Sequence, residues 1–300
     1  MKHIITLVFI LSTTVFTLQS QKSALPTGPI DPTKTYQIEL KDGSEFIGTI
    51  ISLDSTVLEI KTSSIPKIQI YVETIKKMNV IENKMEFKGA TAIPNPHPTR
   101  YFFAPSAYNL AKGEKYYQNS DLLLHSVNVG VTDHFSIGAG LELISTFATI
   151  GKDWSPIFFF TPKIGYQVVE NLNVGAGVLF VYMGPLASLG ANTTSFNMEY
   201  GLVTYGNKEN NVTLGMSTTL QGGKFLFNGA PITVNGMFRM GRKTTFITEN
   251  WILPKVGSVF SYGVRFFGSK MSVDVGFLNN KDIAKVLFIG IPYLDFVVKF

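Results

Sequence analysis

The sequence predicts an all-β protein in two parts: a small five-stranded barrel, followed by an antiparallel transmembrane β-barrel of about 12 strands. Three observations predict the larger barrel. Apolar and polar residues alternate in many successive segments, which gives each predicted strand one apolar and one polar face. These segments span about 9 to 13 residues, whereas a tilted membrane strand needs ~9–11 residues and an average strand has ~5–6. Short and longer connections also alternate, as in barrels that cross membranes.

Composition agrees with this class of protein. Of 300 residues, 45% are hydrophobic and only 16% are charged, against ~25% charged residues in an average soluble chain. This mixture excludes a disordered chain, a coiled coil and collagen. The net charge of +5 is too small to indicate nucleic-acid binding. The absence of cysteine excludes disulfides, thiolate metal sites and a cysteine nucleophile.

Residues 1–20 have the pattern of a secretory signal peptide. Lys2 and His3 form a short positive end, an uncharged apolar run follows from Ile4 to Leu18, and Ser20 provides a plausible cleavage site. The alternative is a membrane anchor, but the run is short for the ~20 residues of a spanning helix. We therefore expect export of the mature chain.

Residues 35–88 predict the small barrel. Five short strands with alternating residues are separated by turn signals, of which Asp42-Gly43 suits a tight hairpin because glycine tolerates a positive φ. Five strands of this length bury little apolar surface unless the sheet closes on itself.

This stretch resembles the Sm-like family of small barrels in three features: the Leu40-Lys-Asp-Gly43 sequence, Gly48-Thr49-Ile50, and an acidic turn at Asp54. The resemblance implies the fold. Cytoplasmic members bind RNA, but seven lysines and eight acidic residues between Tyr36 and Lys88 form no basic patch, so we expect no nucleic-acid partner. A periplasmic protein or glycan partner and a passive spacer remain as alternatives.

Residues 89–99 are predicted to be a proline-rich linker. Pro94, Pro96 and Pro98 alternate, which favours extended backbone and removes hydrogen-bond donors. His97 is expected to be a solvated loop residue.

Residues 100–300 are assigned to the transmembrane barrel. We expect both ends of the barrel on the side of the short turns, and 10 or 14 strands are the alternatives to 12. The approximate cores of the expected strands are 101–109, 119–130, 135–146, 157–169, 173–183, 195–205, 211–221, 231–240, 244–252, 259–267, 270–278 and 287–300.

The polar faces predict a set of charged side chains in the lumen. Such charges inside one wall are tolerable as pairs or in water, so we expect either an ion-pair network that fills a narrow barrel or a polar constriction of a channel. The predicted residues are Glu142, Lys163, Glu199, Arg239, Glu249, Arg265 and Asp274. Tyr200, Val264 and Val273 are expected to face lipid.

The last strand carries the most specific signal. Leu294, Phe296, Val298 and Phe300 are apolar at every second position, and Phe300 is the last residue. This resembles the C-terminal assembly signal of Gram-negative outer-membrane β-barrels. The resemblance implies an outer-membrane location with the small barrel in the periplasm. It also implies contact with outer-membrane lipid and with the barrel assembly machinery.

These patterns favour a non-enzymatic protein, either a narrow pore or a structural barrel with a periplasmic interaction module. One alternative is an outer-membrane lipid hydrolase, and another is a soluble secreted β-barrel binding protein. His125 and Ser126 are adjacent, but neighbours on a strand point in opposite directions, so they do not form a local dyad. No histidine spacing indicates a metal, and we expect no cofactor.

Overall fold

The computed structural model describes residues 30–81, 85–88, 90–148, 154–184, 194–221, 224–226, 230–254 and 257–300. The predicted signal peptide lies outside these ranges. The chain divides into two compact units, with the boundary between Pro94 and Asn95. Residues 95–99, which were expected to belong to the linker, are therefore part of the second unit. No helix among the described residues has the length and apolar character that a membrane span requires.

The first unit contains the five predicted strands. They are β1 (Thr35–Leu40), β2 (Glu45–Leu53), β3 (Val57–Lys61), β4 (Ile68–Tyr71) and β5 (Ile75–Ile81), with the 3₁₀ turn η1 (Val72–Thr74) before β5. They form an antiparallel sheet in the order β4-β3-β2-β1-β5, and β6 (Met85–Phe87) pairs with β7 (Ala90–Ala92) as a separate hairpin.

Alternation produces the core of this sheet. Its buried residues come from the inward positions of the five strands, because successive side chains of a strand point to opposite faces. They are Tyr36, Ile38, Ile50, Leu58, Ile60, Ile70, Ile75 and Met78.

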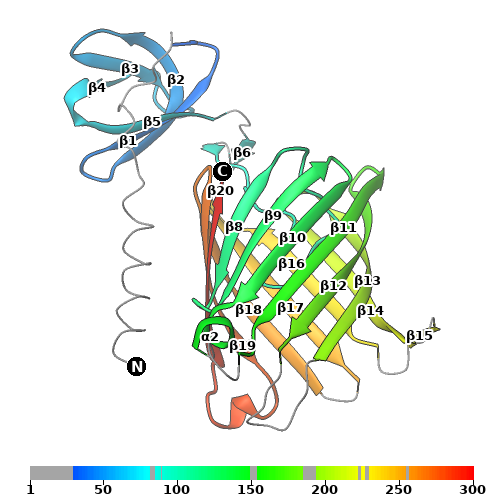
Figure 1. Cartoon of the computed structure of the whole chain (residues 1–300). Helices are drawn as coiled ribbons and strands as arrows, with labels where there is room; N and C mark the ends of the chain where they lie inside the picture. Colours follow the sequence, from blue (N-terminus) through cyan, green and yellow to red (C-terminus); the bar gives the residue numbers. More distant parts are fainter. Residues whose placement is uncertain are drawn as a thin grey trace. The chain divides into compact units, whose positions relative to one another are not determined.

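The second unit is a closed antiparallel barrel of 12 strands (Figure 1). The first six are β8 (Lys115–Ser120), β9 (Leu124–Thr132), β10 (Phe135–Glu142), β11 (Ile157–Val169), β12 (Leu172–Met183) and β13 (Thr194–Gly206). The others are β14 (Asn211–Gln221), β16 (Ile232–Arg239), β17 (Thr244–Leu253), β18 (Gly257–Phe267), β19 (Met271–Asn279) and β20 (Ile291–Lys299). Pairing of β20 with β8 and of β13 with β14 completes the ring.

The predicted strand number is right, but two of its strands are wrong. Residues 101–109 form no strand. The expected strand 119–130 is two strands, β8 and β9, which are joined by a turn. Asp121 and Leu122 in this turn both adopt positive φ. The two errors cancel in the count. Residues 101–109 fit poorly into a β-ladder for two reasons. Pro105 has no N–H group to donate, and the run Tyr101-Phe-Phe-Ala104 does not alternate.

Short turns lie at one end of the barrel and most longer connections at the other, as predicted. The turns that follow β9, β11, β13, β16 and β18 lie at the end where β8 begins and where Phe300 ends the chain (Figure 1). The opposite end carries α2 (Leu143–Ala148), the short strand β15 (Lys224–Leu226) and the 3₁₀ turn η3 (Ile283–Lys285). We call these the short-turn end and the long-connection end.

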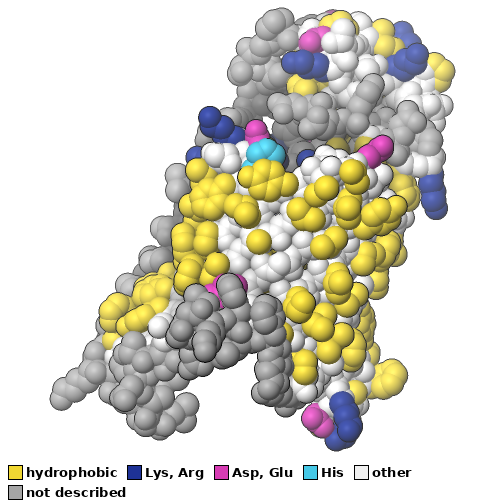
Figure 2. Space-filling view, turned by 90° about the vertical axis from the view of Figure 1, so that its right-hand side faces the viewer, with side chains coloured by type: hydrophobic (Ala, Val, Ile, Leu, Met, Phe, Trp, Pro, Cys, Tyr) yellow, Lys and Arg dark blue, Asp and Glu magenta, His cyan; other side chains and the backbone are white. Residues whose placement is uncertain are grey.

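The outer face of the barrel is apolar. Large hydrophobic side chains project from it at every second position, as in β11, where Phe158, Phe160 and Ile164 are exposed while Lys163 between them is buried. Phe158 stacks on Tyr182, and Phe160 stacks on Phe180 of the neighbouring strand. Figure 2 shows hydrophobic side chains spread over the visible wall of the barrel.

Candidate functional site

The lumen is occupied by the segment from Asn95 to Leu110, which we call the inner segment. Its side chains are largely buried: Tyr101 and Phe102 have no exposed surface, and His97 is 1% exposed. The interpretation of His97 as a solvated loop residue is therefore wrong. Tyr101 and Phe102 pack with Met237, Ile247 and Tyr293 from the barrel wall, which makes a hydrophobic core inside the lumen.

Prolines lower the energetic cost of burying this segment. Four prolines in and just before the segment, at 94, 96, 98 and 105, have no N–H group, so fewer backbone donors require partners inside the barrel. Many of the backbone groups that remain are bonded by charged side chains of the wall. The predicted lumen charges thus act chiefly as anchors for the inner segment.

Glu249 on β17 binds the backbone N–H groups of the inner segment. Its Oε2 atom accepts hydrogen bonds from the N–H groups of Phe102, Phe103 and Ala104, each at 2.9 Å. Its Oε1 atom accepts one from the indole N–H of Trp251 at 2.7 Å. Four donors on one buried carboxylate replace the water that burial removes.

Arg265 on β18 binds the backbone carbonyls. Its Nη1 donates to the carbonyl of His97 and its Nη2 to the carbonyl of Tyr101, both at 2.7 Å. The same guanidinium forms a fork with Asp274 on β19, with Nε–Oδ1 at 2.7 Å and Nη2–Oδ2 at 2.8 Å. One arginine therefore binds both the wall and the inner segment.

Two residues that the sequence interpretation missed extend this network. Arg100 of the inner segment lies 2.6 Å from Asp295 on β20 and 3.2 Å from Asp274, and all three side chains are at most 4% exposed. The polar position Asp295 between Leu294 and Phe296 was a sequence signal for an inward acid. Arg100 was missed because its segment was assigned to the wall.

Lys163 and Arg239 complete the set of anchors. The ammonium of Lys163 donates to the carbonyls of Tyr108 at 2.6 Å and Ser106 at 3.0 Å. Arg239 pairs with Glu209, whose other oxygen accepts the N–H of Asn95 at 2.8 Å. The inner segment is thus held at its beginning, middle and end.

Close contacts with glycine also position the segment. A Cβ atom on Gly165 would lie 2.4 Å from the carbonyl oxygen of Ala107, and one on Gly175 would lie 3.3 Å from its Cα. These glycines of β11 and β12 let the inner segment lie directly against the wall.

Two of the seven predicted lumen charges make no described contact with the inner segment. Glu142 ends β10 and accepts the N–H groups of Ile144 at 2.9 Å and Ser145 at 2.6 Å, so it caps the start of α2. Glu199 lies on the outer face, because it pairs with Val178, whose strand exposes Val174 and Phe180 on that face.

The orientation of β13 is the reverse of the prediction. Met198, Tyr200 and Leu202 line the interior, while Val203 and Tyr205 are exposed on the outer face. The alternation of β13 was read correctly, but its apolar face was assigned to the wrong side. A polar face marks the inside only when the lumen is uniformly polar, and here part of it is not.

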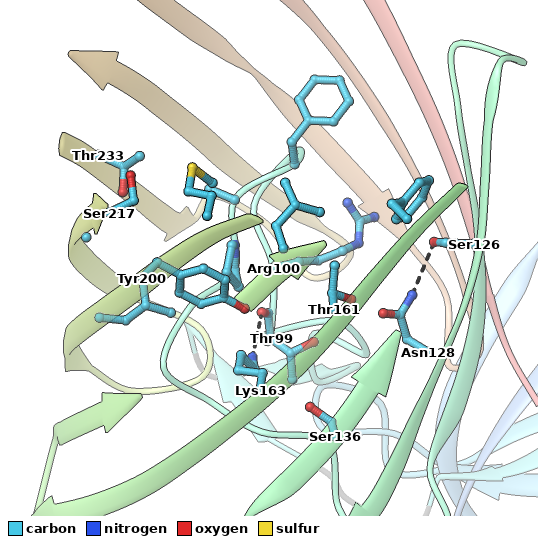
Figure 3. Close-up of a pocket in the computed structure, with 18 of the residues that line it drawn as sticks. Thr99, Arg100, Ser126, Asn128, Ser136, Thr161, Lys163, Tyr200, Ser217 and Thr233 are labelled. Carbon is cyan, nitrogen blue, oxygen red and sulfur yellow. Dashed lines mark hydrogen bonds between the residues drawn. The ribbon is translucent and has the colours of Figure 1, made fainter. Parts of the chain in front are cut away.

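The part of the lumen that is not uniformly polar is a chamber of about 260 Å³ beside the inner segment. Figure 3 shows its polar residues, with Lys163 close to Thr99 and Tyr200 pointing toward them. Phe159, Leu179, Met198 and Leu202 supply apolar surface. Ser126 and Asn128 also line it.

The barrel wall has a seam next to this chamber. β13 pairs with β12 over Thr194–Tyr205 but with β14 only over Glu199–Gly206. Beyond this point Thr219–Gln221 of β14 pair with β15 instead. Among the described residues, the backbone of 194–198 therefore has no partner on the β14 side.

His125 does not form a dyad with a serine. Its Nδ1 lies 2.6 Å from the hydroxyl of Tyr117, and Asn119 lies 3.2 Å from the ring. Ser126 faces the chamber, on the other side of the wall. The described residues contain no group of three or more His, Cys, Asp or Glu placed to hold a metal ion.

No family model matches the chain, and no curated protein matches it. Among solved structures, Salmonella typhi OmpF in complex with daunomycin is 8% identical with a TM-score of 0.33, over 89% of this chain and 96% of that chain. A loop L8 deletion mutant of OmpT, an outer membrane protein of Vibrio cholerae, is 13% identical with a TM-score of 0.30, over 89% and 96%. Pseudomonas aeruginosa OccK5 (OpdH) is 8% identical with a TM-score of 0.33, over 89% and 95%. Similarity at this level supports no inference about function.

Proposed function

We propose that the chain is an integral outer-membrane β-barrel of non-enzymatic type, with its lumen closed by its own inner segment and its first unit in the periplasm. The observation that carries this proposal is the apolar outer face of a closed barrel. In water, exposed side chains such as Phe160 at 41%, Phe180 at 45% and Leu214 at 55% would form an unusually large apolar surface. In hydrocarbon the same surface is favourable.

Closure of the barrel supports the same placement. A bilayer core offers no water to backbone N–H and C=O groups, so a sheet crosses it only when its strands pair around a ring. The 12 strands form such a ring, and the longer ones, with 10 to 13 residues, meet the ~9–11 residues that a crossing needs.

The orientation of the barrel follows from its connections. In outer-membrane barrels short turns face the periplasm and longer loops face outward. The barrel strands begin and end at the short-turn end, which supports a periplasmic location for the first unit, where it would serve as a module for a protein or glycan partner. Leu294 of β20 and Phe300, which follows β20, are exposed, and the assembly machinery would bind the alternating apolar residues there.

The inner segment favours a structural or ligand-binding role over an open pore. Solutes that crossed the lumen would have to displace a segment that Glu249, Arg265 and Lys163 bind through its backbone. We therefore propose that the resting protein conducts no ions.

Single-cysteine labelling tests the membrane placement, because the chain has no native cysteine. A polarity-sensitive probe on Val203→Cys or Val264→Cys in liposomes should report hydrocarbon. The same probe on Tyr71→Cys, which is 64% exposed in the first unit, should report water. Water-like emission from both barrel positions would refute the proposal. Planar-bilayer recordings test closure, and a stable open conductance from the folded protein would refute that part.

A further inference from the structure

The chamber beside the inner segment has the properties of a ligand site. Its volume of about 260 Å³ is not filled by the inner segment. A cavity of roughly 150 Å³ lined by apolar residues binds one benzene ring, so this chamber has space for a somewhat larger molecule.

One side of the chamber is lined by apolar side chains. Phe159, Leu179, Met198 and Leu202 come from three adjacent strands, β11, β12 and β13. Tyr200 lies so close over Gly177 that a Cβ there would be 2.4 Å from its hydroxyl oxygen. On β13 this arrangement turns apolar residues inward and places Asn197 and Glu199 on the outside. An apolar inner face of this kind is favourable when the chamber holds an apolar group and unfavourable when it holds only water.

The other side offers positive charge and hydrogen bonds. The described lining includes Arg100 and Lys163 but neither Asp nor Glu. Arg100 is paired with Asp295, whereas the described partners of Lys163 are backbone carbonyls, which leave its charge uncompensated. The hydroxyl of Tyr200 makes no hydrogen bond to any described residue and lies toward Lys163 and Thr99 (Figure 3). Lys163 already donates to the carbonyls of Thr99, Ser106 and Tyr108, so an acidic headgroup would supply its missing counter-charge and an acceptor for the Tyr200 hydroxyl.

We infer that the chamber binds a small amphipathic acid: an apolar body of about ten carbon atoms that lies against Phe159, Leu179 and Met198, with a carboxylate beside Lys163 and Tyr200. The binding itself does not depend on where the barrel is located. The route rests on the proposed function: in a membrane, the seam at residues 194–198 lies where β13 begins, at the long-connection end, and such an acid would enter there from the membrane surface.

Trp251 lines the chamber and provides the signal for a test. The chain has two tryptophans, so Trp154→Phe leaves Trp251 as the only one. The full chain carrying this substitution is reconstituted in lipid nanodiscs and titrated with 10-bromodecanoate, whose bromine quenches nearby indole fluorescence. The alcohol of the same length, 10-bromodecanol, is titrated in parallel.

We expect saturable quenching by the acid, with a midpoint about tenfold lower than that of the alcohol, which corresponds to one charge-assisted interaction. Tyr200→Phe should raise the midpoint for the acid several-fold. Equal midpoints for acid and alcohol would overturn the assignment of an acidic ligand. Quenching that rises linearly without saturation would overturn the site.

Matched variants separate the chamber from the lipid. Thr161→Phe places a ring inside the chamber and should abolish saturable quenching, whereas Ile164→Phe places the same ring on the outer face of β11 and should leave it unchanged. If Thr161→Phe does not fold, as judged by heat-modifiable gel migration, Ser126→Phe replaces it. Saturation that survives a folded chamber-filling variant would overturn the site. The titration is repeated in amphipol without lipid. This measurement tests the ligand site independently of the membrane placement, which the Val264 probe tests.

Discussion

Arg265 and Asp274 face each other across β18 and β19 as a two-bond fork, and both side chains are 0% exposed. Because Arg265 also donates to the carbonyls of His97 and Tyr101, this pair connects the inner segment to the wall. Fully buried charges are tolerable only while each keeps its partner.

Asp274→Asn should therefore destabilise the second unit by about 3 kcal/mol or more, because it leaves the Arg265 guanidinium buried without its counter-charge. Urea unfolding of the full chain in lipid vesicles, followed by Trp fluorescence, measures the change. Asp282→Asn removes an acid from an exposed pair with Lys285 and should shift stability by less than about 1 kcal/mol. Equal shifts for both variants would contradict the role given to the fork.

Much of the barrel follows from its sequence because alternation is a local property. Phe158, Phe160 and Ile164 face outward and Lys163 faces inward, as period two requires. The ends of the strands follow less well, since the expected strand 135–146 ends at Glu142 and the expected strand 287–300 begins at Ile291.

The lumen could not be predicted by the same argument. Alternation separates two faces but does not say which one is inside, so Tyr200 and Glu199 were exchanged when β13 was assumed to have a polar interior. The inner segment depends on contacts between residues more than 100 positions apart, such as Glu249 with Phe102, and no local pattern records them. Arg100 was missed for this reason, whereas Asp295 was missed although its polar position between Leu294 and Phe296 indicates an inward acid.

Glu249→Gln should loosen the middle of the inner segment. The glutamine oxygen can still accept the N–H groups of Phe102, Phe103 and Ala104, but the three bonds lose their ionic component, which costs about 1–2 kcal/mol. Hydrogen exchange of these three amides should accelerate by about tenfold or more. The amide of Ala176 in the β11–β12 ladder serves as the control and should not change. Unchanged exchange at residues 102–104 would show that the carboxylate charge is not needed.

In the first unit, Glu59 on β3 predicts a defined response to acid. Its carboxylate accepts hydrogen bonds from Lys67 at 2.7 Å, Gln69 at 2.8 Å and Ser52 at 3.0 Å. These partners, with Lys67 first, lower the pKa of Glu59 from 4.5 to about 2. A lowered pKa contributes stability above the unfolded value that is lost as the pH falls through the folded value, so the loss should occur between about pH 4.5 and pH 2. Titration of the side-chain carboxyl carbon by NMR in the full chain measures the pKa of Glu59, and Glu59→Gln assigns the signal. A midpoint near the ordinary value would contradict the three contacts.

A disulfide between Ala107→Cys and Gly175→Cys should lock the inner segment to β12. The Cβ of Ala107 lies 3.5 Å from the position of a Cβ on Gly175, within the ~3.5–4.5 Å range that disulfides span. The chain has no other cysteine, so the bond can be detected by mass spectrometry as the loss of two hydrogens. The pair Ala107→Cys and Gly201→Cys should not form it, because a Cβ on Gly201 has no heavy atom within 4 Å. Bilayer recordings should be flat for the double variant both oxidised and reduced, since the segment closes the lumen without the bond. Channels that open on reduction would instead make the inner segment a gate.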